Sequence, residues 1–364
     1  MMISLLLVLV CYGLLLGQPV LAPAGWPAPA QAKAYAPDNS FFASAEIVEL
    51  TLSLPLEQVL KDRGASPGLH PASISYRTAN GSTQTLAVQV QVRGNRRKDP
   101  AVCGFPPLLV RFPPPNGHSS LFGAVAELKL TTHCLSDDYT LREYLVYKLY
   151  NALTDFSYRA RLCRITYRDS NGREDTSVHY GFFLENTEAL ARRNQATVVP
   201  KPLFIGMENL DQPATATMVL FQFMVGNTDW SVPYRHNIRL LSRSLATPPV
   251  PVAFDFDYSG LVSAPYAVPP EQLGIASVRQ RVFRGYDFPP EILAAVRGLF
   301  NTRRAALYNV YLACPYLSHE EQEFATRYLN GFYKILNDSK DFERQIVRVG
   351  RQNEKRYTHI RGFD

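Results

Sequence analysis

The stretch that decides the fold is Gly226-Asn227-Thr228-Asp229, followed by His236-Asn237-Ile238-Arg239-Leu240 and by Val252-Ala253-Phe254-Asp255-Phe256-Asp257. Ile238–Leu241 and Val250–Phe254 are rich in apolar residues, and the segment between them, Ser-Arg-Ser-Leu-Ala-Thr-Pro-Pro, is rich in turn formers. This pattern predicts a β-hairpin. Because the first residue of one antiparallel strand lies near the last residue of its partner, we expect Asn237 and Asp255 to meet at the open end.

Several oxygen ligands converge at that end of the predicted hairpin. Asp229, in the turn just before it, can reach the same place as Asn237 and Asp255. Carboxylate and amide oxygens suit Mg²⁺ or Mn²⁺ and a bound phosphate. Asp and Asn also favour turns and caps for local reasons, so each residue alone fits a structural role. Their order, however, is that of a kinase site, with a loop Asp, a downstream Asn, a short hairpin and a metal-binding Asp.

The N-terminus predicts export. Ile3–Leu16 is a nearly unbroken apolar run, shorter than the roughly 20 residues of a membrane span, and small residues at Val20-Leu21-Ala22 and Ala30-Gln31-Ala32 offer cleavage sites. We therefore expect residues 1–32 to be a signal peptide and leader, and the mature chain to be periplasmic, on the cell surface or extracellular, without a transmembrane span. An N-terminal anchor helix that stays attached is the alternative.

Composition restricts the class of partner. A hydrophobic content of 46% with 19% charged residues is ordinary for a globular protein, and the net charge is a modest +6. No basic and aromatic residues interleave as in nucleic-acid-binding motifs, so we expect no nucleic-acid partner. The basic cluster Arg96-Arg97-Lys98 fits a solvated face as well as a partner site.

The cysteines predict one disulfide. None of those beyond the leader has the CxxC spacing of a zinc site, and an exported chain permits disulfides. Cys103 precedes the predicted strand Leu108–Phe112, and Cys134 follows the predicted strand Ala126–Leu130. If these strands pair antiparallel, Cys103 and Cys134 lie at the same end and form a disulfide, with Cα atoms within about 7 Å. The other cysteines of the mature chain are Cys163 and Cys314.

Alternation and helical periodicity predict an α+β fold. Asp137-Asp138 can cap a helix over Thr140–Leu153, whose buried stripe would be Leu141, Leu145, Leu149 and Ala152. From Glu188 the pattern becomes helical, with helices ending near Val225, running from Pro290 through Tyr311, and from Ser318 to Leu336. The strands that we expect before Glu188 are Glu46–Leu54, Leu86–Val92, Leu108–Phe112, Ala126–Leu130, Arg161–Tyr167 and Val178–Leu184.

This layout is that of a two-lobed, atypical protein-kinase-like fold. Residues 33–187 would form an antiparallel-sheet N-lobe with one main helix, and residues 188–364 a mostly helical C-lobe carrying the catalytic loop and metal-site hairpin. A kinase also needs a sheet Lys to bind phosphate and a helix Glu to position it. Lys129 and Glu143 occur in that order, so we predict that they form an ion pair facing the cleft. An exposed strand Lys and a solvated Glu are the structural alternatives.

Glu185 ends the last strand of the sheet lobe, where a kinase links its lobes. Glu185 would contact the nucleotide, or it would only mark the point where the chain leaves the sheet. The chain contains no Gly-x-Gly-x-x-Gly and no His-Arg-Asp, so a kinase here is atypical.

The chain resembles the CotH-type spore-coat kinases, which are secreted or surface-associated atypical kinases. The matching elements are Val92-Arg93-Gly94-Asn95, the segment Leu128–Arg142, Tyr180–Glu185, Gly226–Asp229 with His236-Asn237, and Phe254–Asp257. The resemblance implies a protein kinase that uses ATP with Mg²⁺ or Mn²⁺ and a protein acceptor. It also implies Asp229 as the catalytic-loop Asp, Asn237 and Asp255 as metal ligands, and Asp257 as an assisting ligand.

The chain departs from that family at two places. Asp229 and Asn237 are separated by an inserted Trp230–Arg235, where kinases have a spacing of about five. Arg96-Arg97-Lys98 replaces the Ser-rich stretch that often follows Arg-Gly-Asn. Two alternatives therefore stay open: a non-catalytic surface or coat-type pseudokinase, and a metal-dependent hydrolase using Asp229, Asp255 and Asp257.

Overall fold

The computed structural model describes residues 40–112, 120–123 and 125–356. The predicted signal peptide and its cleavage sites lie outside these residues. No helix within the described part of the chain is long and apolar enough to cross a membrane. All of the described residues belong to one compact unit. The predicted lobe boundary between residues 187 and 188 therefore stays a prediction.

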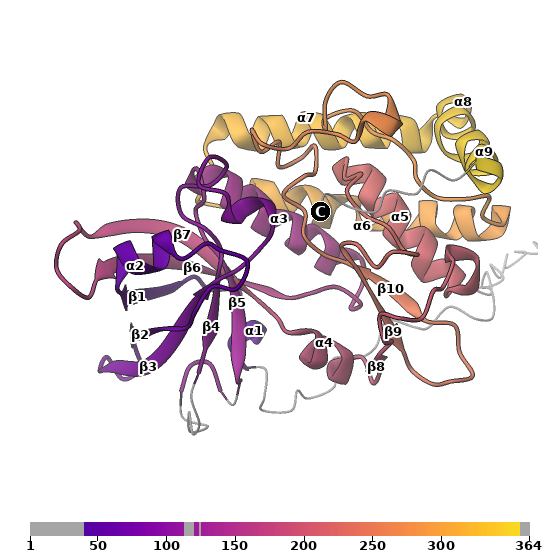
Figure 1. The fold of residues 1–364 in the computed structure, drawn as a ribbon. Coiled ribbons are helices and arrows are strands. Elements are labelled where there is room, and N and C mark those ends of the chain that lie inside the picture. Colours follow the sequence, from indigo (N-terminus) through magenta and orange to yellow (C-terminus); the bar gives the residue numbers. More distant parts are fainter. Residues whose placement is uncertain (1–39, 113–119, 124, 357–364) are drawn as a thin grey trace, which may run out of the picture. The chain divides into compact units, whose positions relative to one another are not determined.

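Most strands close into a barrel, drawn in indigo to magenta in Figure 1. Its order is β1-β2-β3-β4-β5-β7-β6, and neighbouring strands are antiparallel except β1 and β6, which are parallel. The predicted strands are present, but the predicted antiparallel sheet closes through the parallel pair β1 and β6. The strand β2 was missed because its large buried apolar residues are few. The bounds are β1 Val48–Leu54, β2 His70–Arg77, β3 Thr83–Val92, β4 Leu108–Arg111, β5 Glu127–Thr131, β6 Ala160–Asp169 and β7 Ser177–Leu184.

The pleat of β7 joins two hydrophobic clusters. Successive strand residues point to opposite faces. Phe183 therefore packs in the barrel interior, whereas its neighbour Phe182 packs against the helices. Both side chains are fully buried. The barrel wall consequently has a core on each side.

The helix that covers this wall is α3, Asp137–Leu153, which contacts β6, β7, α5 and α6. Three residues of its predicted stripe, Leu141, Leu145 and Leu149, are buried as expected, whereas Ala152 is only partly buried. Arg142 Nε lies 3.1 Å from Glu321 Oε1 and so connects α3 to α7. The other long helices are α5 Gln212–Val225, α6 Pro290–Leu312 and α7 His319–Asn337. In Figure 1 the labels α5 and α6 are to the right of α3, and α7 is above it.

The predicted hairpin is also present. β9 (Ile238–Ser242) and β10 (Val250–Ala253) are antiparallel with Ala253 opposite Ile238, and β8 (Thr197–Val198) pairs with β9. The Phe254 N–H donates to the Asn237 carbonyl at 3.1 Å, just beyond the ladder. This bond places Asn237 and Asp255 at the same open end.

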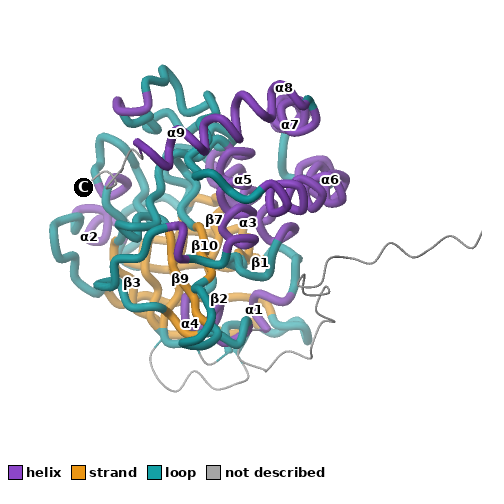
Figure 2. The backbone as a smooth tube through the Cα atoms, turned by 90° about the vertical axis from the view of Figure 1, so that its right-hand side faces the viewer, coloured by secondary structure: helices purple, strands orange, loops and turns teal. Residues whose placement is uncertain are grey.

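Short helices complete the unit, and Figure 2 shows α8 and α9 near α7. They are α1 Ser40–Ala43, α2 Leu56–Lys61, α4 Thr187–Arg193, α8 Ser339–Phe342 and α9 Arg348–Arg356. Single turns also occur, namely η2 Arg96–Lys98, η3 Met207–Asn209, η4 Glu271–Leu273 and the π-helical η5 Glu343–Val347.

Candidate active site at the hairpin end

The loop after α5 positions Asp229. Gly226 ends α5 in the left-handed conformation with φ of +70°, and a Cβ there would collide with the Tyr328 hydroxyl. The chain then turns sharply, and the Asp229 N–H donates to Asn227 Oδ1 at 3.1 Å. The Trp230 indole N–H donates to the Asn227 carbonyl, also at 3.1 Å. A buried aromatic and a buried amide therefore hold the backbone that carries Asp229.

Asp229 contacts two side chains that follow the insertion. His236 Nε2 lies 2.7 Å from Asp229 Oδ1, and Asn237 Nδ2 donates to Asp229 Oδ2 at 3.0 Å. Ser231 and His236 form an isolated antiparallel bridge, which loops the inserted residues out. The wider spacing noted in the sequence thus does not separate Asp229 from Asn237.

Backbone strain is concentrated at this end of the hairpin. Arg235, Asn237 and Asp255 have positive φ angles of 52°, 50° and 64°. Non-glycine residues seldom adopt this region, and each such residue costs on the order of 1–3 kcal/mol unless its surroundings compensate. Strain of this kind clusters at functional sites and fixes the direction of side chains.

Asp255 and Asp257 face a buried arginine that the sequence analysis did not assign to the site. Arg97 Nη2 lies 2.9 Å from Asp255 Oδ1, and its Nε lies 3.3 Å from Asp257 Oδ2. Its Nη1 lies 2.9 Å from Glu143 Oε2. The predicted Lys129–Glu143 ion pair is therefore wrong, because Glu143 pairs with Arg97. Only its place between two other basic residues, beside Arg-Gly-Asn, could have singled out Arg97.

These four side chains, here called the Arg97 cluster (Arg97, Glu143, Asp255 and Asp257), differ in exposure and charge. Burial raises the pKa of Glu143 and, more strongly, that of Asp257, although Arg97 opposes both shifts. Burial would also raise the pKa of Asp255, but the nearby cations Arg97, Arg93 and Lys129 outweigh it and lower the pKa. The Asp255 side chain is 36% exposed, against 9% for Asp257. Asp255 is thus the ionised and accessible carboxylate of the cluster.

Lys129 is one of the cations that lower the pKa of Asp255. Burial and the neighbouring cations Arg93 and Arg239, opposed by Asp255, together lower the pKa of Lys129 to about 8. The Lys129 Nζ is 6.0 Å from the centre of the Phe254 ring. Lys129 therefore belongs to a basic group near Asp255, although it does not pair with Glu143.

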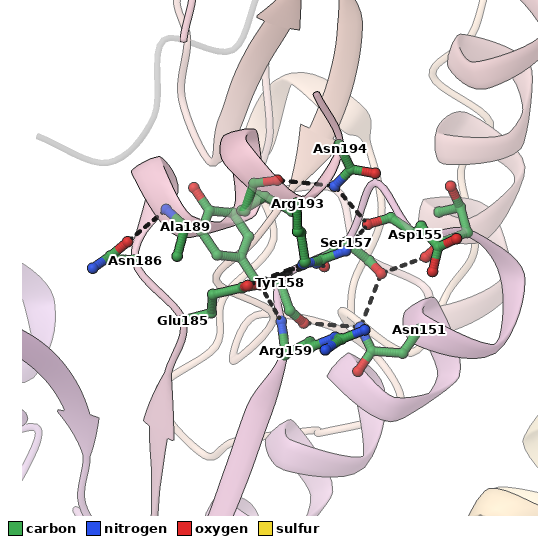
Figure 3. A network of polar contacts seen from close by, with 12 residues as sticks. Asn151, Asp155, Ser157, Tyr158, Arg159, Glu185, Asn186, Ala189, Arg193 and Asn194 are labelled. Carbon is green, nitrogen blue, oxygen red and sulfur yellow. Dashed lines mark hydrogen bonds and ion pairs between the residues drawn. The ribbon is translucent and has the colours of Figure 1, made fainter. Parts of the chain in front are cut away.

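Glu185 lies in a separate network, shown in Figure 3. Arg193 Nε lies 3.0 Å from Glu185 Oε1, and Arg193 Nη2 donates to Glu185 Oε2 at 3.0 Å. The backbone N–H of Arg159 also donates to Oε2, at 3.1 Å. Both oxygens of this fully buried carboxylate are therefore engaged within the protein, which fits the alternative that Glu185 serves the fold.

The residues fit a divalent cation in part. Asn237 uses its Nδ2 to bind Asp229, which leaves its amide oxygen as the ligand type that Mg²⁺ takes. Asp255 offers an accessible carboxylate, but Arg97 already contacts Asp255 and Asp257. Within the described residues, no group of three or more His, Cys, Asp and Glu side chains is arranged to hold a metal. A metal here would depend on Asn237 and on movement of Arg97.

A small pocket and the predicted disulfide border the cluster. The pocket is lined by Arg97, Glu143, Asp257 and Cys134, among others, and has room for about one water molecule. Cys103 and Cys134 form the disulfide, with Cα atoms 4.8 Å apart, which confirms the prediction. Its basis is also confirmed, because β4 and β5 are antiparallel neighbours.

Comparisons with known proteins leave the family open. No protein-family model matches the chain, and no curated protein matches it. Among solved structures, the chain is similar to the crystal structure of a Helicobacter pylori proinflammatory kinase, CtkA. The two share 12% identity over 81% of this chain and 94% of that chain, with a TM-score of 0.35. A similarity of this size carries no weight for fold or function, so membership of the CotH-type family stays a prediction.

Proposed function

We propose that the protein is an exported, CotH-like atypical kinase that transfers the γ-phosphoryl group of ATP to a hydroxyl of a protein acceptor. One observation carries the proposal. Asp229 and Asn237 are hydrogen-bonded at the open end of a hairpin, and Asp255, at the same end, faces a cation paired with the α3 glutamate Glu143. This combines the loop Asp, the Asn, the metal Asp and the helix Glu of phosphoryl-transfer sites.

Each acidic residue takes a distinct role in this proposal. Asp229 is oriented by His236 and Asn237 and accepts the proton of the acceptor hydroxyl. The oxygen of that hydroxyl attacks the γ-phosphorus, and the bond between the γ-phosphorus and the leaving ADP breaks. Asp255 and Asn237 hold Mg²⁺ or Mn²⁺, with Asp257 assisting. The metal, when bound, neutralises charge on the phosphates.

The basic residues supply the phosphate contacts. Lys129 and Arg93 lie near Asp255, where the phosphates of a metal-bound nucleotide would lie. Arg97 replaces Lys129 as the partner of Glu143. These cations opposite the carboxylates disfavour the hydrolase alternative, which expects a compact acidic site without them.

A non-catalytic surface or coat-type protein is the second candidate, and Arg97 favours it. The guanidinium contacts both carboxylates that would hold the metal. A protein that had lost metal binding could keep such an ion cluster for its fold alone. Export itself is supported by the disulfide, since disulfides persist in oxidising compartments.

The test is incubation of the mature protein with labelled ATP and Mn²⁺, read as self-phosphorylation or ADP release, together with the shift in melting temperature. The wild type should show both transfer and a shift. Asp255→Asn should lose both, whereas Asp229→Asn should keep much of the shift and lose transfer. Asp175→Asn, in an exposed loop, is the matched control. Absence of any metal-nucleotide shift in the wild type would replace the kinase proposal with the non-catalytic one.

A further inference from the structure

Three carboxylates of the Arg97 cluster share the guanidinium of Arg97. One guanidinium faces three carboxylates and uses a different nitrogen for each: Nη1 for Glu143, Nη2 for Asp255 and Nε for Asp257. The Arg97 side chain is 10% exposed, so solvent contributes little screening. Carboxylates this close repel one another, and the arrangement is stable only while a cation lies among them.

Arg97 reaches the cluster from a loop and not from a strand. It lies in the single turn η2, between β3 and β4. The loop is fixed at its ends, since Lys98 Nζ donates to the Gly64 carbonyl at 2.9 Å and the Cys103 N–H donates to the Asp99 carbonyl at 2.9 Å. The backbone is thus held while the long side chain keeps its rotatable bonds.

We propose that Arg97 is an internal counter-cation that takes the place of a divalent cation at Asp255 and Asp257, and that metal binds when the guanidinium leaves these two carboxylates. The inference rests on the proposed metal site. A metal ion and a guanidinium compete for the same oxygens, so each weakens the binding of the other.

Glu143 gives the displaced side chain a second position. It is the carboxylate of the cluster that the metal does not need, so the Nη1 contact to Glu143 persists while Nε and Nη2 are released. Released N–H donors of a guanidinium bind phosphate oxygens with charge-assisted hydrogen bonds. The same arginine therefore stabilises the metal-free site and contacts the nucleotide after exchange.

The experiment measures Mn²⁺ binding without nucleotide, by calorimetry or by the spectroscopic signal of free Mn²⁺. Wild type should bind weakly, and Arg97→Gln should bind at least tenfold more tightly because the competing cation is gone. Arg97→Gln should also melt lower without metal and recover with Mn²⁺. Arg164→Gln, which removes an exposed arginine paired with Glu49, is the matched control and should behave as wild type.

Two further variants keep the inference testable. Adding Asp255→Asn to Arg97→Gln should abolish the gain in affinity. If Arg97→Gln does not fold, Arg97→Lys serves instead, since an ammonium cannot bridge three carboxylates in the arginine geometry and should leave Mn²⁺ binding several-fold tighter than in wild type. Mn²⁺ affinity that is equal to wild type, or weaker, in the Arg97 variants overturns the inference.

The outcomes separate this inference from the kinase proposal. Tighter Mn²⁺ binding in the Arg97 variants, with no nucleotide-dependent shift in any variant, supports the counter-cation and removes the kinase. Nucleotide-dependent shift and transfer in wild type, with unchanged Mn²⁺ affinity in the variants, supports the kinase and removes the counter-cation.

Discussion

Arg193 and Arg97 both bind carboxylates through buried side chains, and they differ in the number of carboxylates that they contact. Arg193 faces one carboxylate, Glu185, and also donates to the carbonyls of Asp155 and Ser157 (Figure 3). Arg97 faces three carboxylates and contacts no carbonyl among the described hydrogen bonds. Arg193 thus contacts one carboxylate, whereas Arg97 contacts three.

The difference separates structure from function. The Arg193–Glu185 pair fixes a chain segment, here the start of β6 and the end of β7 next to α4, and both oxygens of its carboxylate are engaged within the protein. Three carboxylates around one guanidinium repel one another, and such an arrangement has a reason to persist where a further cation binds. Asn237 and Asp255, both with positive φ, lie beside the Arg97 cluster, whereas Gln195 is the residue with positive φ that follows Arg193.

The largest expected effect on stability comes from breaking the Arg193–Glu185 pair. Arg193→Met removes the partner of a carboxylate that is fully buried, so the free energy of unfolding should fall by about 3 to 5 kcal/mol. Arg192→Met, on the exposed neighbour, should change it by about 0.5 kcal/mol or less. Both are measured by chemical denaturation. Mn²⁺ affinity should be unchanged in Arg193→Met, and a change in it would contradict the separation of the two clusters.

The second effect concerns the loop that carries Arg97. Replacing Cys103 and Cys134 by Ser opens a bridge with a sequence separation of 31. The chain-entropy relation gives a loss of about 3 to 4 kcal/mol. Oxidised and reduced wild type are compared in denaturant with the double variant, and the reduced wild type should match the variant. Recovery of Cys103 and Cys134 as free thiols in unreduced protein contradicts the bridge.

The third effect is a pH dependence near the same disulfide. His133 stacks on His179 with ring centres 3.7 Å apart, and burial together with the charge of His179 lowers the pKa of His133 to about 3. The unfolded chain therefore binds one more proton between pH 6.5 and 3. Stability from this group is complete above about pH 6.5 and falls by up to about 1.4 kcal/mol per pH unit below it. His133→Asn should flatten that slope in denaturation measured from pH 7 to 5, and an unchanged slope contradicts the assignment.

Local patterns in the sequence predicted what local physics determines. The hairpin followed from two apolar runs around a turn, α3 from its spacing of Leu141, Leu145 and Leu149, and the disulfide from two antiparallel strands. The parallel contact between β1 and β6 escaped, because such pairing joins segments far apart in the chain and leaves no local signal. The same reason hid Arg97, whose partner Asp255 lies 158 residues away.

Residue type alone also misled the assignment of the basic residues. A Lys on a strand before a helix Glu suggested Lys129 as the partner of Glu143, whereas the run of basic residues around Arg97 fitted a solvated face as well as a partner site. In the structure Glu143 pairs with Arg97 and not with Lys129. Arg97 can donate from three nitrogens to three carboxylates, and the single ammonium of a lysine cannot match that geometry.

The smallest expected effect belongs to Lys129, which tests whether the basic group near Asp255 serves a ligand. Burial lowers the pKa of Lys129 to about 8, whereas Asp255 attracts its charge. Lys129→Met removes the free-energy cost of burying an ammonium, which stabilises the fold. It also removes the attraction to Asp255, which destabilises the fold, so the two effects oppose each other. We expect a change in stability at pH 7 of about 1 kcal/mol or less.

The pH dependence gives the sign. Between about pH 8 and 10.5 the unfolded state holds the Lys129 proton and the folded state has lost it, so wild-type stability rises with pH in this window. Lys129→Met lacks this rise, which thermal denaturation at pH 7, 8.5 and 9.5 detects. The variant should nevertheless weaken binding of ATP with Mn²⁺, although its fold is intact. Unchanged nucleotide affinity would remove Lys129 from the site and leave Arg93 and Arg97 as its cations.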